Sequence, residues 1–394
     1  MGSIEVRTSD FTQHSLKNFL EPFAHWECFI PVVTPQCHAS NLLVLDNGDL
    51  LCAWFGGTQE GKPDISIYLS RKLANSKEWN KAARVTFDIT RSEQNPVLFQ
   101  TPTGDVWLLY TSQNLGDQDS AVVKKQVSMD RGLTWSQPEV IFNDPGTFIR
   151  QPVVVLDNGD WVLPTFRCRS EPGVRWVGND DISAVRVSSD QGKTWTEREV
   201  PRSFGCVHMQ IRRLKSGVHM ALFRSRWADQ IYKSFSADGV AWSEPVPTSL
   251  PNPNAGICFD VLPSGKVLVV YNHSSKLDAQ GRREGLYDDI AAADDVRKNQ
   301  SSKHDGKEAF WGAPRAPLCI ALSGDEGESW RTSILEEGDG FCMTNNSEEK
   351  LNRELSYPSI AQSNDGAVHI AYTFWRQSIK YIQIDPKVIN EILP

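Results

Sequence analysis

The chain has 394 residues and a formal net charge of −8, with 40% hydrophobic and 23% charged side chains. This composition is typical of a soluble globular protein that can bury a sizeable core. The acidic balance argues against a general nucleic-acid or anionic-membrane binder.

The N-terminal segment, MGSIEVRTSDFTQHSLKNF, contains no apolar run of signal-peptide length, and no stretch of the chain approaches a membrane span. The eight cysteines lie far apart and form no C-x-x-C pair. This spacing argues against a zinc site or a redox motif, and it favours buried free thiols in a reducing compartment. We therefore expect a cytoplasmic protein, with secretion by another route left open.

One pattern recurs along the chain: an apolar strand, a tight turn that ends in glycine, and a second apolar strand. The first copy is NLLVLDNGDLLCAWF and the last is YPSIAQSNDGAVHIAYTF. Asn-Gly, Ser-Gly and Asp-Gly between strand-like runs predict hairpins, because glycine accepts the positive φ of these turns. The six turn glycines are Gly48, Gly104, Gly159, Gly217, Gly265 and Gly366.

A second motif, S-x-D-x-G-x-[ST]-W, is interleaved with the hairpins. Complete copies run over 128–135, 188–195 and 323–330, and a shortened copy runs over 236–242. In such a turn the Asp and Ser side chains bond to nearby backbone, glycine takes the special dihedral angle, and tryptophan packs underneath. We therefore assign a structural role to the four aspartates of the motif, Asp130, Asp190, Asp238 and Asp325.

The two patterns together predict the fold class. Six hairpins, most of them about 55 residues apart, imply six four-stranded units, and this is the signature of an all-β, six-bladed β-propeller. The longer interval of 101 residues between Gly265 and Gly366 predicts one blade plus an insertion over 275–313, charged and helix-like in its middle. That insertion is either a functional lid or a solvated loop. We expect one domain over 1–394, in which N-terminal strands complete the last blade.

The innermost strand of each propeller blade starts at one mouth of the central channel. Counting back about nine residues from each hairpin glycine finds these starts, and the residues there are mostly polar. A ring of convergent polar groups in a concavity predicts a binding site. The ring consists of His38 or Ser40, Asn95, Arg150 with Gln151, His208, Asn254 to Gly256, and Tyr357.

The S-x-D-x-G-x-T-W turns resemble the Asp-boxes of the sialidase (neuraminidase) superfamily, whose members are six-bladed propellers. The resemblance implies that arginines hold a substrate carboxylate and that a tyrosine opening the last blade is the nucleophile. The segment GAPRAPLCIALSGDEGESW places one arginine at Arg315, ALFRS places another at Arg224, and Tyr357 stands at the nucleophile's position. For the acid/base aspartate, the loop GGTQEGKPDISIYLS offers Glu60 first and Asp64 second.

Two positions depart from this resemblance. The first arginine of the family is missing at the start of the first blade, where TPQCHASNLL offers His38. The glutamate that activates the family's tyrosine is replaced by His208, whose side chain suits proton transfer near neutral pH. Asn95 and Arg150 are expected to contact the sugar.

Three functions fit these residues. The first, which we favour, is an exo-glycosidase that hydrolyses a terminal acidic sugar: Tyr357 attacks with help from His208, and Glu60 protonates the leaving group. The second is a polysaccharide lyase that eliminates at a uronate, using arginines to neutralise the carboxylate and Tyr or His as acid and base. The third is a non-catalytic carbohydrate-binding propeller. No pattern indicates a metal or another cofactor, so the expected partner is a glycan or a small acidic sugar.

Overall fold

Each predicted hairpin forms around its glycine in the computed structural model, which describes residues 25–290, 297–385 and 387–389. At the first hairpin the N–H of Leu45 donates to the carbonyl of Asp49 at 2.8 Å, and Gly48 has a φ of +83°. A residue with a β-carbon is disfavoured at this angle, so the glycine sets the turn. The other five turn glycines have φ between +82° and +98°, and each of their turns closes with the corresponding hydrogen bond. The predicted hairpins are therefore confirmed.

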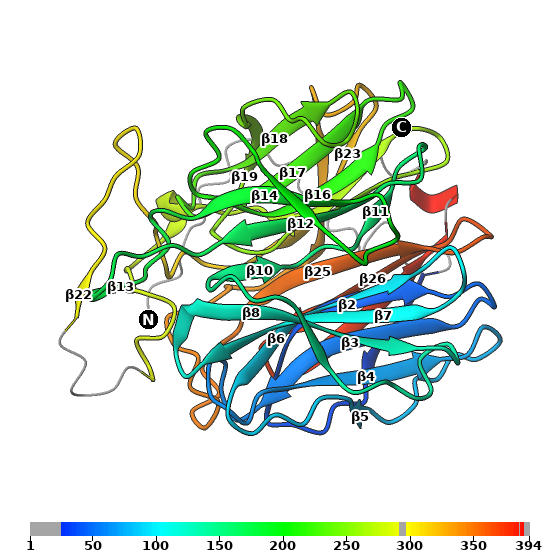
Figure 1. Cartoon of the computed structure of the whole chain (residues 1–394), viewed down its shortest axis with the longest axis horizontal. Helices are drawn as coiled ribbons and strands as arrows, with labels where there is room; N and C mark the ends of the chain where they lie inside the picture. The colour runs from blue at the N-terminus through cyan, green and yellow to red at the C-terminus, as the bar shows by residue number, and fades with distance from the viewer. Residues whose placement is uncertain (1–24, 291–296, 386, 390–394) are drawn as a thin grey trace.

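The strands assemble into six blades, and each blade is built from strands that follow one another in the sequence (Figure 1). The first blade contains β2 (Gln36–Val44), β3 (Leu50–Gly57), β4 (Ser66–Lys72) and β5 (Ala83–Arg84). The second contains β6 (Ser92–Gln100), β7 (Val106–Asn114), β8 (Asp117–Ser128) and β9 (Glu139–Phe142). The third contains β10 (Thr147–Ile149), β11 (Val154–Val155), β12 (Trp161–Arg167), β14 (Ile182–Ser188) and β15 (Thr196–Glu199).

The remaining three blades follow the same plan. The fourth contains β16 (Cys206–Arg213), β17 (His219–Ser225), β18 (Gln230–Ser236) and β19 (Val246–Pro251). The fifth contains β20 (Cys258–Val261), β21 (Val267–Asn272), β23 (Leu318–Ser323) and β24 (Arg331–Glu336). The sixth contains β25 (Leu355–Gln362), β26 (Val368–Phe374), β27 (Ser378–Ile384) and, from the other end of the chain, β1 (His25–Ile30). The predicted all-β, six-bladed propeller is confirmed.

The sixth blade joins the two ends of the chain. Strand β1 pairs antiparallel with β27, with Cys28 opposite Tyr381. Each end therefore covers the sheet edge that the other would expose, and this closes the ring without a free edge at β27.

The Asp-containing turns are held by their own side chains. In the first turn, Ser128 Oγ donates to Asp130 Oδ1 at 2.7 Å, and the N–H of Thr134 donates to the same oxygen at 2.8 Å. Hydrogen bonds from Thr134, and then from Ser128, lower the pKa of the Asp130 carboxyl. The corresponding serine bonds form at Asp190, Asp238 and Asp325. The structural role predicted for these aspartates is therefore confirmed.

The apolar core is divided among the contacts between neighbouring blades. Among the described residues, six of the seven clusters of buried apolar side chains lie between adjacent blades, one for each pair. The sixth and first blades share a cluster around Trp54, and the second and third share one in which the rings of Trp107 and Trp161 lie 5.2 Å apart. Because each blade is packed on both sides, the inner strands are held rigidly around the channel.

The predicted insertion lies between Asn272, at the end of β21, and Leu318, at the start of β23. It contains the 3₁₀ turn η1 (Lys276–Asp278) and the short strand β22 (Lys298–Asn299), which pairs in parallel with β13 (Val174–Arg175) (Figure 1).

The predicted helical middle of the insertion includes 291–296, which lie outside the described residues. In the part of the insertion that the structure describes, no α-helix forms, so the helix prediction is wrong there. The carboxylate of Asp288 accepts the N–H groups of Glu284 and Gly285 at 2.9 and 3.1 Å. Such local side-chain bonds favour a turn over a helix.

All eight cysteines are free thiols, and all but Cys28 are buried, as the sequence predicts. Within the described ranges, no helix has the length and apolar character needed to cross a membrane. In the same part of the chain, no group of three or more His, Cys, Asp or Glu side chains is arranged to hold a metal ion.

Candidate active site at the channel mouth

Left-handed residues mark the starts of the inner strands. Ala39, Asn95, His208, Asn254 and Tyr357 have φ between +50° and +60°. At four of them the strand pairing shifts register, in β2, β6, β16 and β25. Such a bulge leaves its residue out of the ladder and re-aims the side chain, and strained backbone of this kind clusters at functional sites. The bulges bring the rings of His208 and Tyr357 to 5.6 Å from each other.

Tyr357 lies at the centre of the group and is only 7% exposed. Its ring is 4.2 Å from the ring of His38, and the guanidinium groups of Arg150 and Arg224 each lie 5.5 Å from its centre. The guanidinium of Arg315 lies 5.7 Å away. The structure thus brings together six of the predicted site residues: His38, Arg150, His208, Arg224, Arg315 and Tyr357. Another predicted residue, Asn95, is buried at the corresponding bulge of the second blade.

Arg224 forms a hydrogen bond with Tyr357. Its Nη1 donates to the Tyr357 hydroxyl, and its Nε donates to Asn254 Oδ1 at 2.8 Å. Burial lowers the pKa of Arg224 to about 9; the hydroxyl of Tyr357 opposes this shift, and the like charges of Arg226 and Arg315 add to it. An anion bound beside Arg224 would therefore stabilise its charged form.

Glu354 directly precedes β25 and is the ionic centre of the site. Its carboxylate accepts from Arg315 Nη1 at 3.1 Å and from Ser356 Oγ at 2.6 Å, and it lies 3.3 Å from Arg376 Nε. Burial by itself would raise the pKa of Glu354, but the charges of Arg315 and Arg376 hold it well below its usual value. The carboxylate is therefore ionised, and it positions two guanidinium groups.

Glu60 joins the same network from the first blade. Its Oε2 accepts from Arg376 Nη1 at 2.6 Å, and its backbone N–H donates to Gln36 Oε1 at 2.6 Å. Glu60 is buried, and its partner Arg376 also lies 3.4 Å from His38 Nε2. The first choice for the acid/base residue is therefore in the site, but as one half of an ion pair.

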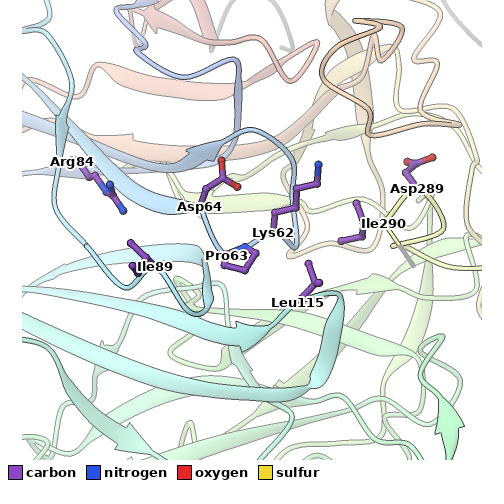
Figure 2. Close-up of a pocket in the computed structure, with 8 residues that line it drawn as sticks. All are labelled: Lys62, Pro63, Asp64, Arg84, Ile89, Leu115, Asp289 and Ile290. Carbon is purple, nitrogen blue, oxygen red and sulfur yellow. The ribbon is translucent and has the colours of Figure 1, made fainter. Parts of the chain in front are cut away.

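Asp64, the second choice, lies apart from this network. It is exposed and accepts the N–H of Thr58 at 2.7 Å within its own loop. Figure 2 shows Asp64 on the wall of a pocket of about 620 Å³, which also contacts Asp289 and Ile290 of the insertion. The loop therefore directs Glu60 toward the residues around Tyr357, and Asp64 toward the pocket on the surface.

The buried charges around Tyr357 do not balance. Five arginines are buried there: Arg150, Arg224, Arg226, Arg315 and Arg376. Three buried carboxylates face them: Glu60 and Glu354 as above, and Asp181, which pairs with Arg226 at 2.8 Å. Among the described residues, Arg150 and Arg224 have no carboxylate partner. The site therefore carries an excess of positive charge, and this suits an anionic ligand.

The two histidines beside Tyr357 are neutral. Burial lowers the pKa of His38 and His208 well below 6.5, and the surrounding arginines lower both further. Since His38 is neutral, its 3.4 Å contact with Glu354 is not an ion pair, and its Nδ1 lies 2.9 Å from Thr373 Oγ1. His208 Nδ1 is buried and has no hydrogen-bond partner in the described part of the chain.

These neutral histidines predict how stability depends on pH. Both have a lower pKa when folded than the usual 6.5, so below that pH the unfolded chain binds more protons and stability is lost as the pH falls. Each histidine contributes up to about 1.4 kcal/mol per pH unit. Urea denaturation at about pH 7.5 and about pH 5.5 should show this loss.

A matched variant tests the contribution of His208. In His208→Asn, where asparagine tolerates the left-handed backbone, the free energy of unfolding should change less between the two pH values. An equal or steeper change in this variant would contradict the assignment of a neutral folded His208.

The insertion covers the site. Leu286, Tyr287 and Trp311 pack in one buried cluster with Phe166 and Trp176 of the third blade. The ring of Trp311 lies 5.7 Å from the Arg224 guanidinium and 5.3 Å from that of Arg226.

Phe310 of the same segment bonds to the wall of the site. Its N–H donates to the carbonyl of Arg226 at 2.8 Å, and its carbonyl accepts from Asn254 Nδ2 at 3.0 Å. Residues 286–287 and 309–311 of the insertion therefore pack on the site, whereas Leu277 is 89% exposed. A functional lid stays a prediction.

Sequence reasoning missed several residues of the site, among them Glu354, Arg376, Arg226 and Trp311. A signal existed for three of them. Glu354 stands three residues before Tyr357, and Arg226 and Arg376 lie one and two residues after the ends of β17 and β26, the second strands of their blades. Comparing strand ends across the repeats would have found the two arginines. Trp311 gave no such signal, because the insertion has no counterpart in the other blades.

Comparison with known proteins agrees with this architecture. The sequence pattern of the BNR repeat-like domain matches residues 48–370. No curated protein is significantly similar in sequence.

Several solved structures share the fold. The Hadza microbial sialidase Hz136 has a TM-score of 0.65 at 16% identity, and the match covers 90% of this chain and 66% of that one. A Dyadobacter fermentans protein of unknown function has a TM-score of 0.65 at 14% identity, over 91% of this chain and 97% of that one.

A third structure, Trypanosoma rangeli sialidase in complex with the inhibitor DANA, has a TM-score of 0.61 at 11% identity, over 91% of this chain and 57% of that one. The chain thus spans about two thirds or less of the length of the two sialidases. At these identities the likeness concerns the fold alone.

Proposed function

Because this chain belongs to the family of BNR repeat-like domains, we propose that its channel mouth binds a terminal acidic sugar and hydrolyses the glycosidic bond of that sugar. The sialidase-like fold supports a carbohydrate ligand. The observation that carries the proposal is the contact between Arg224 and Tyr357. In this contact a buried guanidinium, without a carboxylate partner among the described residues, donates to the Tyr357 hydroxyl, which is the nucleophile of our proposal.

The carboxylate of the sugar would complete the charge balance of the site. Arg150 and Arg224 supply the unbalanced positive charge, and Arg150 Nε and Nη1 have no hydrogen-bond partner in the described part of the chain. A guanidinium offers parallel, permanently charged N–H donors that match a carboxylate. Binding of the carboxylate there orients the sugar ring over Tyr357.

The hydrolysis would proceed in two displacements. Tyr357 Oη attacks the anomeric carbon, the bond from that carbon to the leaving oxygen breaks, and the leaving oxygen takes a proton. Water then attacks the same carbon, the bond from that carbon to Tyr357 Oη breaks, and a proton from the water restores the phenol. A tyrosine is preferable to a carboxylate here, because a carboxylate would repel the anionic sugar. Arg224 stabilises the negative charge that develops on the phenol oxygen.

Two side chains would move the protons. His208 Nδ1 has no hydrogen-bond partner in the described part of the chain, so it would take the proton of Tyr357 after a small rotation of either ring. Because its pKa is lowered, it would hold that proton weakly and return it readily. Glu60 is the carboxyl group that we propose for the leaving oxygen, but it must first exchange its ion pair with Arg376 for a proton. Because Phe310 and Trp311 contact the wall of the site, we expect residues 309–311 to move when the sugar binds.

A second candidate function is elimination at a uronate. The observation that favours it is the pair of neutral histidines beside Tyr357, together with the commitment of Glu60 to Arg376. Arginines on the uronate carboxylate would acidify the adjacent C–H. A histidine would remove that proton, the carbon–oxygen bond to the leaving unit would break as the double bond forms, and Tyr357 would protonate the leaving oxygen.

A panel of sialosides, ketodeoxy acid glycosides and uronides separates these functions. Hydrolysis should release a free sugar acid without new ultraviolet absorbance from an unsaturated product. An ultraviolet absorbance that grows as a uronide is turned over would show that the reaction is elimination and not hydrolysis. Saturable binding without turnover would indicate a carbohydrate-binding propeller, and neither binding nor turnover of any acidic sugar would overturn the proposal.

A further inference from the structure

A second cavity, of about 530 Å³, lies between the first and second blades. Its wall comes from residues 83–88 at the outer edge of the first blade, from β7 and β8, and from residues 132–138 that follow the Asp130 turn. None of its lining residues is among the channel-mouth residues named above, although Leu69, Val85 and Tyr110 belong to the same apolar cluster as Tyr357. We call this cavity the inter-blade groove.

The floor of the groove carries polar atoms without partners. Tyr110 Oη, Gln126 Oε1 and Glu93 Oε2 are buried and have no hydrogen-bond partner among the described residues. The three side chains are only 0%, 5% and 1% exposed. Buried polar atoms are almost always paired in folded proteins, because an unpaired one costs about 1–3 kcal/mol. These three atoms therefore point to a ligand with hydroxyl groups. Such hydroxyl groups would donate to the Gln126 amide oxygen and the Glu93 carboxylate oxygen, and would either donate to or accept from the Tyr110 phenol.

The rim of the groove is apolar. Phe87 and Leu133 are 68% and 71% exposed, and Trp135 lies partly buried beside them. Aromatic and aliphatic side chains around a few convergent polar groups are the usual composition of a small-molecule site. Large exposed apolar side chains next to such a site supply a platform for the C–H face of a ring.

The charges in the groove are already compensated. Lys124 Nζ pairs with Asp88 at 2.8 Å and with Glu93 at 3.2 Å. Arg84 donates to the Thr86 carbonyl at 2.8 Å, and its guanidinium lies 5.1 Å from the centre of the Phe87 ring. The two carboxylates of Asp88 and Glu93 thus balance the two cations of Arg84 and Lys124, and the groove has no net charge to attract an ion. The groove differs in this respect from the channel mouth, where positive charge is in excess.

We propose that the inter-blade groove is a second carbohydrate site, which binds a neutral pyranose. The C–H face of the sugar packs on Trp135 and Phe87, and its hydroxyl groups bond to Tyr110, Gln126 and Glu93. This site is independent of the reaction at the channel mouth. It would hold a neutral unit of a glycan against the outside of the propeller, whether or not a reaction takes place at Tyr357.

Saturation-transfer NMR and calorimetry on the full chain test the proposal, with methyl β-galactopyranoside, methyl α-glucopyranoside and cellobiose as probes. Wild type should bind at least one of them with a Kd on the order of 1 mM. Tyr110→Phe keeps the ring and removes one hydrogen bond, so the affinity should fall about fivefold. Trp135→Ala removes the platform, and the affinity should fall at least about tenfold.

Trp195→Ala is the matched control, because Trp195 ends the corresponding turn of the next blade and does not line the groove. This variant should bind the sugar as wild type does, and thermal melts confirm that each variant is folded. The proposal is overturned if no neutral sugar binds, if binding is unchanged in both Tyr110→Phe and Trp135→Ala, or if Trp195→Ala weakens it equally. Binding of amines or sugar acids in the groove, in place of neutral sugars, would overturn the ligand class.

Discussion

Replacing Tyr357 by phenylalanine should lower kcat on an acidic glycoside on the order of 10³-fold or more, while the affinity for the sugar stays within about tenfold of wild type. The variant keeps the aromatic ring, which packs 4.2 Å from His38 and beneath Arg150, Arg224 and Arg315. It removes only the hydroxyl that accepts from Arg224. If that oxygen forms the bond to the sugar, no other group in the site replaces it, whereas the arginines still bind the carboxylate.

Tyr372→Phe is the control for this experiment. Tyr372 is also fully buried, and its hydroxyl also bonds to a charged side chain, Glu336, at 2.9 Å. It lies in the core between the fifth and sixth blades, so its loss should leave kcat unchanged. Steady-state kinetics and equilibrium binding on both variants separate the two effects. Full activity in Tyr357→Phe would show that the Tyr357 hydroxyl takes part in neither hydrolysis nor elimination.

Replacing Glu354 by glutamine should destabilise the fold by about 3–5 kcal/mol. The carboxylate is the shared partner of Arg315 and Arg376, and both guanidinium groups are buried. Without its charge, two arginines lie close together in a poorly solvated site with only Glu60 opposite them. Removing one partner of a buried ion pair leaves an uncompensated charge, and this costs far more than losing a surface pair.

Urea denaturation at neutral pH measures this effect, and Glu349→Gln provides the control because Glu349 is exposed. The control should change the free energy of unfolding by less than about 0.5 kcal/mol. A loss below about 1 kcal/mol in Glu354→Gln would show that Glu354 does not hold the network together. A second readout is available: if Arg315 shifts when its partner is lost, the affinity for the acidic sugar should also fall.

The blade architecture was predictable because its determinants are local. A left-handed glycine and one backbone hydrogen bond define each hairpin, and the Asp130 turn is built from residues 128–135 alone. Repetition of these two patterns fixes the number of blades, and the inner-strand positions follow from the distance to each glycine. For this reason the channel-mouth positions of His208 and Tyr357 could be predicted without any long-range contact. The insertion has no repeat to compare with, and its predicted helix was the error in the fold.

The sequence by itself determined the propeller, the structural role of the Asp turns, and the positions of the tyrosine, the two histidines and three of the five arginines at the channel mouth. Only the tertiary structure decided how deeply these residues are buried and which partners they bond to. The ion pair between Glu60 and Arg376 joins residues 316 positions apart, and the bond between Arg224 and Tyr357 joins residues 133 apart. Burial and partners of this kind arise when the ring closes, because desolvation and charge pairing depend on everything that surrounds a group. That is why Glu60 could be placed in the site from sequence, whereas its commitment to Arg376 could not.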